Sequence, residues 1–157
     1  LRDLARPLGF ADVATSIQSG NLLLPAPAAA TAEAIEDGLA DAVATRFGFR
    51  PMILMRRCAD LTAALRGNPF AQRISDGKQL HLYFYDGVVD QWDETALRAL
   101  AVDGEDLLLT PGILYLFARD GIGRSKLAAK LPRYLPARYS ARNLNSIECI
   151  LALAADD

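Results

Sequence analysis

The chain is poor in histidine and cysteine, which many enzymes use for metal binding and for acid–base or nucleophilic chemistry. Its 157 residues include one histidine and two cysteines. These residues cannot form the tetrahedral ligand set of a structural zinc site, so no metal is expected. Cys58 and Cys149 are also too few and too far apart in sequence for a disulfide framework, and neither belongs to a Cys-x-x-Cys motif.

Long apolar runs and a dominant charge are missing as well. No stretch approaches the length of a transmembrane helix and no signal peptide is evident, so a cytoplasmic protein outside the membrane is expected. The formal net charge is −2, which gives no overall attraction to nucleic acids or anionic membranes. A function that depends on positive charge therefore requires a local patch. The sequence carries no signal for an oligomeric state.

The sequence shows few candidates for catalytic residues. The alternation in LHLYFYD (80–86) puts His81 on the strand face opposite Leu80 and Leu82, beside Tyr83. A lone histidine on the polar face of a strand is a weak indication of catalysis, and no Gly-x-Ser-x-Gly motif presents a nucleophilic serine. Catalytic residues are therefore not identified, and no cofactor is indicated. Asp103, Glu105 and Asp106 lie beside a turn, and this acidic run is expected to be solvated.

Helical and strand patterns alternate along the chain and predict an α+β fold of two small subdomains with mixed or antiparallel sheets. Residues 13–24 are expected to form two strand halves or one strand bulged at Ser19 and Gly20. Further strands are expected at 51–55 and 80–85, and a hairpin at 107–118 turning at Thr110, Pro111 and Gly112. Helices are expected at 1–8, 31–47, 58–67, 93–101, 125–131 and 142–154.

Several motifs resemble a bacterial family, domain of unknown function 1697. They are LGFADVATSIQSGNLLL, NPF (68–70), DGIGRSKL and ARNLNSIECILAL, in the family's order. The resemblance implies two α+β subdomains, taken as 1–78 and 79–157, the first of them ferredoxin-like. It also implies a strand and a glycine-containing loop upstream of Leu1, which the complete protein is expected to have. The family's RNWNT motif is altered here, because Leu144 replaces its tryptophan and Ser146 its threonine.

The stretch DGIGRSKL (120–127) is the strongest candidate for a binding site. Glycines before a basic helix start let backbone amides point outward together, and the helix start adds positive potential. The spacing is not that of a Walker A loop. A simpler interpretation is a tight turn capped by Asp120 or Ser125, with the basic residues solvated. The candidate anion-binding residues are Gly121, Gly123, Arg124, Ser125 and Lys126.

Two further motifs carry polar side chains that could contact a ligand. In SIQSGN the candidates are Gln18, Ser19 and Asn21, although the same residues are typical of a turn or bulge. In RNLN the candidates are Arg142, Asn143 and Asn145; either asparagine could instead cap a helix. NPF is expected to be a turn with Phe70 buried.

These observations favour a small cytoplasmic protein that binds a phosphate-bearing small molecule or nucleotide through the glycine-rich basic loop. An enzyme acting on such a ligand, with His81 or an upstream residue as acid–base, is an alternative. A nucleic-acid-binding module that uses a local arginine patch is another.

Overall fold

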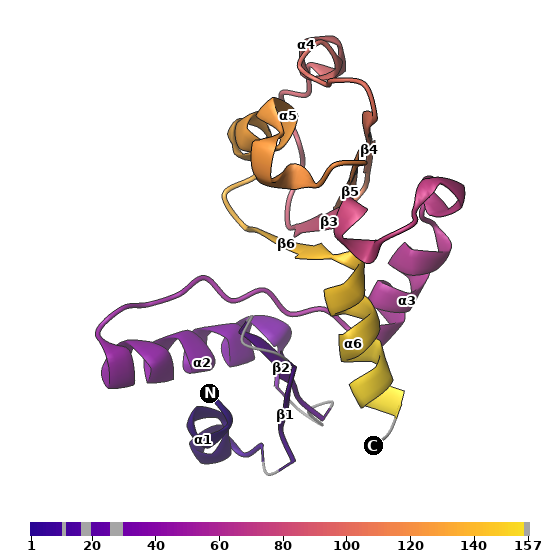
Figure 1. Ribbon diagram of the computed structural model, residues 1–157. Helices are drawn as coiled ribbons and strands as arrows, with labels where there is room; N and C mark the ends of the chain where they lie inside the picture. The colour runs from indigo at the N-terminus through magenta and orange to yellow at the C-terminus, as the bar shows by residue number, and fades with distance from the viewer. Residues whose placement is uncertain (11, 17–19, 26–29, 156–157) are drawn as a thin grey trace. The chain divides into compact units, whose positions relative to one another are not determined.

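The computed structural model describes two compact units joined in one chain (Figure 1). The described residues are 1–10, 12–16, 20–25 and 30–155. The first unit comprises Leu1–Ala59 with Glu148–Asp157, and the second comprises Asp60–Ile147. Helices combine with two antiparallel sheets, so the fold is α+β, as the sequence predicts. The sequence predicted two subdomains with a boundary at residue 78. That boundary stays a prediction.

The first unit contains a short antiparallel pair of strands. After α1 (Arg2–Ala5) and a 3-10 turn (Arg6–Leu8), β1 (Ala14–Ser16) pairs with β2 (Asn21–Leu23). The register places Ser16 opposite Asn21 and Ala14 opposite Leu23. Two strands that pair with one another cannot be one continuous strand. The expectation of two strand halves is therefore confirmed, and the alternative of a single bulged strand is wrong.

Helix α2 (Ala32–Phe47) supplies most of the buried residues described in the first unit, and its ends are set by local sequence signals. The Thr31 hydroxyl accepts a hydrogen bond from the Ala34 amide at 3.2 Å and caps the start. Gly48 adopts a left-handed conformation (φ 79°) and ends the helix, as predicted. Ile35 and Leu39 of this helix pack with Ala5 and Phe10 in the core.

The predicted strand at 51–55 is wrong. Residues 51–57 form neither helix nor strand. Ile53 and Met55 do pack against the core of the first unit, which explains the apolar composition. Among the described strands, however, β1 and β2 pair only with one another, so this segment has no ladder partner. The Met55 amide instead donates to the Glu36 carboxylate at 2.7 Å.

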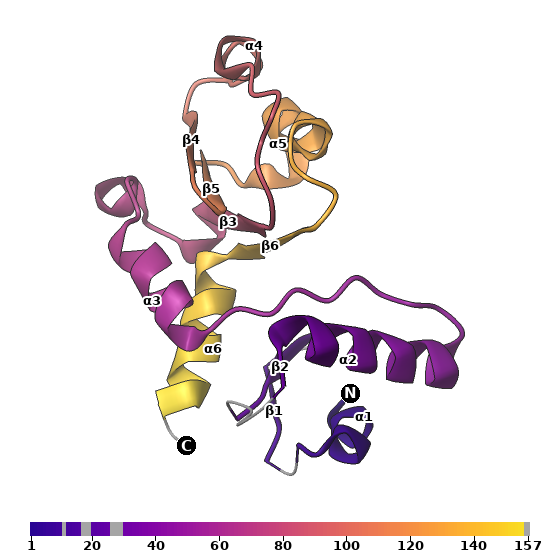
Figure 2. The ribbon, with the colours of Figure 1, turned by 180° about the vertical axis from the view of Figure 1, so that it is seen from behind.

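The second unit is built on a four-stranded antiparallel sheet with strand order β4-β5-β3-β6 (Figure 2). The strands are β3 (Leu80–Tyr85), β4 (Glu105–Thr110), β5 (Ile113–Ala118) and β6 (Tyr139–Asn143). The β4–β5 hairpin turns at Pro111 and Gly112, two of the three predicted turn residues, whereas Thr110 ends β4 and pairs with Ile113. Gly112 takes a positive φ (78°), which glycine adopts without strain.

Strand β6 was not predicted from the sequence, which indicated a helix from residue 142. Arg142 and Asn143 end this strand, and α6 (Leu144–Ala155) begins one residue later. The strand's residues are only partly buried and include no apolar run. Its conformation depends on pairing with β3, which lies far away in sequence.

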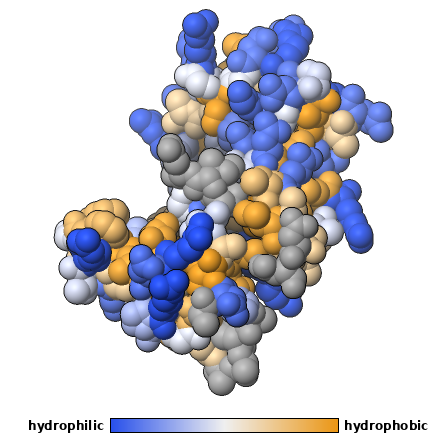
Figure 3. Space-filling model, turned by 60° about the horizontal axis from the view of Figure 1, so that its bottom comes forward, coloured by the Kyte–Doolittle hydropathy of each residue, from blue (hydrophilic) through white to orange (hydrophobic). Residues whose placement is uncertain are grey.

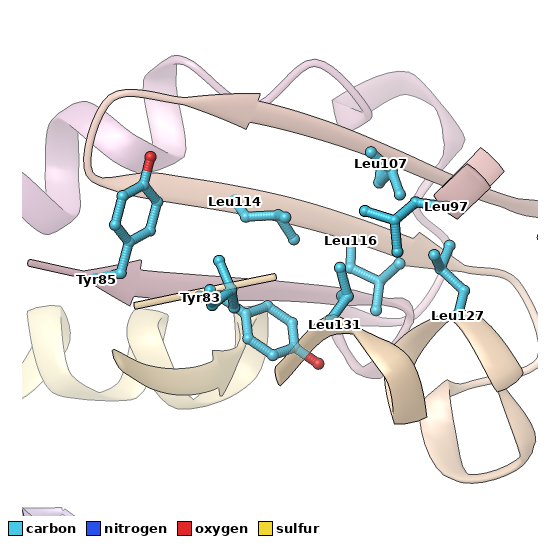
Figure 4. Packing of buried hydrophobic residues seen from close by; sticks show 9 residues of the cluster. Tyr83, Tyr85, Leu97, Leu107, Leu114, Leu116, Leu127 and Leu131 are labelled. Atoms are coloured by element: carbon cyan, nitrogen blue, oxygen red, sulfur yellow. The ribbon is translucent and has the colours of Figure 1, made fainter. Parts of the chain in front are cut away.

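One face of the large sheet is covered by α4 (Glu94–Arg98) and α5 (Lys126–Lys130) (Figures 1 and 2). Side chains from the sheet and from both helices point toward one another in this core (Figure 4). The face that carries His81 is therefore not polar, contrary to the expectation: Tyr83 and Tyr85 are each 5% exposed. The Tyr85 hydroxyl is satisfied by donating to the Thr110 carbonyl at 2.6 Å. The buried members are Tyr83, Tyr85, Leu97, Leu107, Leu114, Leu116, Leu127, Leu131 and Leu135.

The opposite face of the sheet packs against α3 (Cys58–Arg66) and the NPF turn. The Tyr115 hydroxyl donates to the Ala64 carbonyl of α3 at 3.0 Å. Phe70 is 6% exposed and its ring lies 5.9 Å from that of Phe117. The Asn68 side chain accepts a hydrogen bond from the Phe70 amide at 2.9 Å, which confirms the predicted turn.

The surface mixes residue types. On the face seen in Figure 3, hydrophobic and hydrophilic residues are interspersed. Across the described ranges, no helix combines the length and the apolar character needed to cross a membrane.

Replacing Leu116 by alanine should lower the free energy of unfolding by about 2 to 5 kcal/mol, because its fully buried side chain would leave a cavity between the sheet and α5. Leu108→Ala is the matched control, since Leu108 lies on the adjacent strand but is 37% exposed. Urea denaturation followed by circular dichroism measures both. Equal losses would contradict a core between this face and the helices.

Candidate functional site

Three polar segments of the second unit meet at one end of its sheet. Because β3 is antiparallel to both neighbours, its first residues lie beside the last residues of β5 and β6. The register pairs Leu80 with Phe117 and His81 with Asn143. We call this region the loop end of the sheet, defined by residues 75–79, 119–126 and 143–145. Two inter-strand spacings, roughly 10 Å, separate the ends of β5 and β6.

The segment 119–126 forms a turn that leads into α5. Gly121 has a positive φ of 82°, and its amide donates to the Ala118 carbonyl at 2.9 Å. Gly123 has no positive φ, so only one of the two glycines is required by backbone conformation. Ser125 is 7% exposed and caps α5 by accepting a hydrogen bond from the Ala128 amide at 2.9 Å. The predicted helix start near Ser125 is therefore confirmed.

Arg124 and Lys126 project from this turn into solvent. Both are exposed, and neither forms an ion pair with any residue that the structure describes. Asp120 does not cap the helix; it lies 3.9 Å from Arg119, which also contacts Asp103 at 3.3 Å. The capped turn of the simpler interpretation is thus present, and anion binding by the two exposed cations stays a prediction.

The turn at 75–79 is a part of the loop end that sequence analysis missed. The Gln79 side chain accepts hydrogen bonds from the amides of Ser75 (2.9 Å) and Asp76 (3.1 Å), while Asp76 accepts from the Lys78 amide. The same Gln79 donates to the Arg119 carbonyl at 2.9 Å and so ties this turn to the start of 119–126. The spacing of Asp76 and Gln79 is a capping-box signature that could have indicated this structure.

Gly77 brings the 75–79 turn against the RNLN motif. A Cβ atom at this position would overlap the Asn145 side chain and lie 3.0 Å from the Asn145 amide nitrogen. Asn143, one of the candidate ligand residues, accepts a hydrogen bond from the Ser146 amide at 2.9 Å and caps α6. The capping interpretation is thus confirmed for Asn143, whereas Asn145 is exposed beside Gly77.

Arg142 points away from α5. It pairs with Leu82, whose side chain lies on the α3 face of the sheet, whereas its neighbour Ala141 packs in the cluster with α5. Its guanidinium donates to the Ser140 hydroxyl at 3.0 Å and to the Ala141 carbonyl at 2.8 Å. Burial lowers the pKa of Arg142. The structure therefore does not bring this residue to the basic turn.

The candidates of the SIQSGN motif belong to the first unit. Asn21 begins β2 opposite Ser16. Gln18 and Ser19 lie outside the described residues. Contact of Gln18, Ser19 and Asn21 with a ligand stays a prediction.

His81 is partly buried beside the loop end. Its Nδ1 atom is buried and has no hydrogen-bond partner among the described residues. Burial lowers the pKa of the imidazole. Nearby, burial and the neighbouring Tyr139 raise the pKa of Tyr83 to about 12. Within the described part of the chain, no group of three or more histidine, cysteine or acidic side chains is arranged to hold a metal.

Contrary to the expectation, the acidic run near residue 105 is not simply solvated, because Asp106 joins two arginines. Its carboxylate contacts Arg73 at 2.9 Å and Arg98 at 2.6 Å. Burial alone would raise the pKa of Asp106, but these hydrogen bonds outweigh burial and lower it. The Arg73 guanidinium also lies 4.4 Å from the centre of the Phe117 ring. This acidic group is thus occupied by arginines outside the basic turn.

Helices on an antiparallel sheet, with a polar loop end, define a small α+β protein. The chain belongs to the family described as Protein of unknown function (DUF1697), whose model matches residues 1–115. The matched residues end in β5, so the resemblance drawn from DGIGRSKL and ARNLNSIECILAL lies beyond them.

A solved structure shares the fold over nearly the whole chain. The conserved bacterial protein SP0830 from Streptococcus pneumoniae superimposes with a TM-score of 0.69 and 19% sequence identity. The likeness covers 97% of this chain and 85% of that one. At this identity the similarity concerns the fold. Among curated proteins, none matches the chain.

Stability should depend on pH through His81. Because burial holds its pKa below the ordinary value of 6.5, the unfolded chain binds more protons once the pH falls below that value. The contribution is therefore present above about pH 6.5 and declines as the pH falls toward the lowered pKa of the folded state. Urea denaturation of wild type and His81→Gln between about pH 8 and pH 5 should show a smaller acid loss for the variant. Parallel profiles would contradict this.

Gly77→Ala should destabilise the protein more than Gly123→Ala. The new methyl group at residue 77 must displace Asn145, whereas a Cβ at residue 123 meets nothing within 4 Å. We expect a loss of about 1 to 3 kcal/mol at residue 77 and a change within about 0.5 kcal/mol at residue 123. Thermal unfolding of both variants tests this. If Asn145→Ala fails to recover part of the Gly77→Ala loss, the side-chain overlap is not the cause.

Proposed function

We propose that the protein binds a phosphate-bearing small molecule or nucleotide at the basic turn 120–126. The observation that carries this proposal is the exposure of Arg124 and Lys126 and their lack of ion pairs with described residues. Both lie beside a capped helix start. Most other arginines that are exposed in this unit lie against a carboxylate, as Arg98 and Arg119 do.

The surrounding sequence supports an anionic ligand. Residues 121–147 contain six arginines and lysines and no acidic residue, so this stretch carries a formal charge of +6 in a chain of −2. An anion approaching the turn therefore meets no acidic side chain from its own segment. Gly121 and Gly123 leave the backbone uncovered, since no heavy atom lies within 4 Å of a Cβ at either position. The open backbone allows close approach of a phosphate group.

The expected affinity is modest and needs more than the two cations. Charge-assisted hydrogen bonds contribute roughly 1.5 to 3 kcal/mol each, and micromolar binding corresponds to about 8 kcal/mol. Asn145 and the 75–79 turn lie at the same end of the sheet and offer polar groups for further contacts.

A thermal-shift screen with nucleotides and phosphorylated metabolites tests the proposal. We expect at least one compound to raise the melting temperature of the wild type by mass action. Arg124→Ala/Lys126→Ala should abolish this shift and leave the ligand-free melting temperature nearly unchanged, because both side chains are exposed and lack ion-pair partners in the described chain.

His81→Ala serves as the comparison variant in the same screen. It should retain the ligand-induced shift even where its own melting temperature changes, since binding is assigned to the turn. A large fall in the ligand-free melting temperature of the double variant would show that the cations hold the structure together. A wild type unshifted by every phosphate-bearing compound would leave DGIGRSKL as a turn only.

A further inference from the structure

The basic turn continues into a row of exposed cations along α5. Lys126, Lys130 and Arg133 follow the spacing i, i+4, i+7 through α5 and the 3-10 turn Leu131–Arg133, and Arg124 precedes them. This spacing places side chains on one side of a helical segment. All four are exposed. We call Arg124, Lys126, Lys130 and Arg133 the basic face.

The orientation of the basic face is fixed by the core on the other side of the same segment. Leu127 and Leu131 have no exposed surface and pack against the sheet among Tyr83 and Leu116 (Figure 4). Turning the helix to hide its cations would expose these leucines to water, which is unfavourable. The cations are therefore held outward.

The row of cations does not stabilise the helical segment that carries it. Like charges at i, i+4 on a helix are mutually destabilising, and Lys126 and Lys130 form such a pair. No member of the basic face forms an ion pair with a described residue, and the flanking stretch 121–147 contains no acidic residue. Arg50, by contrast, pairs with both Asp37 and Asp41. A row of uncompensated charge is typical of a surface that meets an anionic partner.

The extent of the row favours a partner with several phosphates in line. Residues 126–133 rise about 1.5 Å each in the α-helix and about 2 Å each in the 3-10 turn, which gives roughly 12 Å. One nucleic acid strand carries a phosphate about every 3.4 Å along the helix axis, so this length spans three or four phosphates. A single phosphate group occupies only one end of the row.

We propose that the basic face binds the phosphate backbone of a nucleic acid strand without reading its sequence. Contacts to phosphate oxygens from lysine and arginine position a strand but carry no base information. This goes beyond the proposed function, because Lys130 and Arg133 lie outside the turn 120–126 and the strand does not require a small-molecule pocket.

An anionic membrane fits the basic face less well. Lysine and arginine side chains near an anionic leaflet each contribute only modestly to attachment, and stable attachment needs a second signal such as inserted apolar side chains. The leucines of this segment, Leu127, Leu131 and Leu135, are buried in the core and unavailable for insertion. A nucleic acid needs only the outward cations.

The experiment measures binding of a fluorescein-labelled single-stranded oligonucleotide by anisotropy over a series of salt concentrations. For wild type, the logarithm of the association constant should fall linearly with the logarithm of salt concentration. Lys130→Ala/Arg133→Ala should weaken binding at low salt and reduce the slope by about 1.4, since each lost phosphate contact removes about 0.7 for a single strand.

The control is Arg46→Ala/Arg66→Ala, which removes the same charge from exposed residues in the last turns of α2 and α3. It should leave affinity and slope near wild type. Equal weakening by both double variants would overturn the proposal, because binding would then follow net charge. It would also be overturned if wild type fails to bind the oligonucleotide at low salt, or if it sediments with phosphatidylserine vesicles and binds no oligonucleotide.

The two proposals fail separately. Lys130→Ala/Arg133→Ala should keep any melting shift caused by a phosphorylated small molecule, because the turn 120–126 is intact in that variant. Loss of that shift would show that the row is one site for small phosphates and would overturn the assignment of Lys130 and Arg133 to a strand. If the oligonucleotide binds but no phosphorylated small molecule raises the melting temperature, the basic face is supported as a nucleic acid site. The small-molecule site at the turn 120–126 is then excluded.

Discussion

The packing of α5 against the large sheet is the constraint on which the loop end and the basic face depend. Leu127 and Leu131 enter the same core as Tyr83 and Leu116, on a face that His81 also shares. These leucines hold α5 against the sheet. The path of the turn from β5 to α5 is therefore fixed, and the cationic side chains of the segment point outward. A buried contact thus determines where the charged surface lies.

Electrostatics divide the second unit into two kinds of surface. Near β4, Asp106 is shared by Arg73 and Arg98, and Asp103 is contacted by Arg119. Such exposed pairs contribute little to stability, yet they neutralise one another. Residues 124–133 contain no acidic residue, and their four cations form no ion pair with a described residue, whereas Arg138 further along contacts Asp86 at 3.4 Å. A chain with a net charge close to zero can therefore still present a strongly positive region, which composition alone conceals.

Local signals predicted the boundaries of many elements well. The Thr31 cap, the left-handed Gly48, the turn at Pro111 and Gly112, and the Ser125 cap are all formed as expected, because each depends on contacts within a few residues. Predictions that depended on distant partners did less well. The apolar segment 51–57 has no strand to pair with, while the partly polar β6 is a strand because β3 lies beside it.

The sequence by itself determined the α+β class, the family resemblance and the presence of a capped basic turn, since composition, periodicity and capping act over short distances. Only the tertiary structure decided which candidates share a surface. It joined the 75–79 turn to 119–126 through Gln79 and to Asn145 through Gly77, and it placed Arg142 on the other face of the sheet. Such neighbours are fixed by strand register and by packing between distant segments, and no local pattern carries that information.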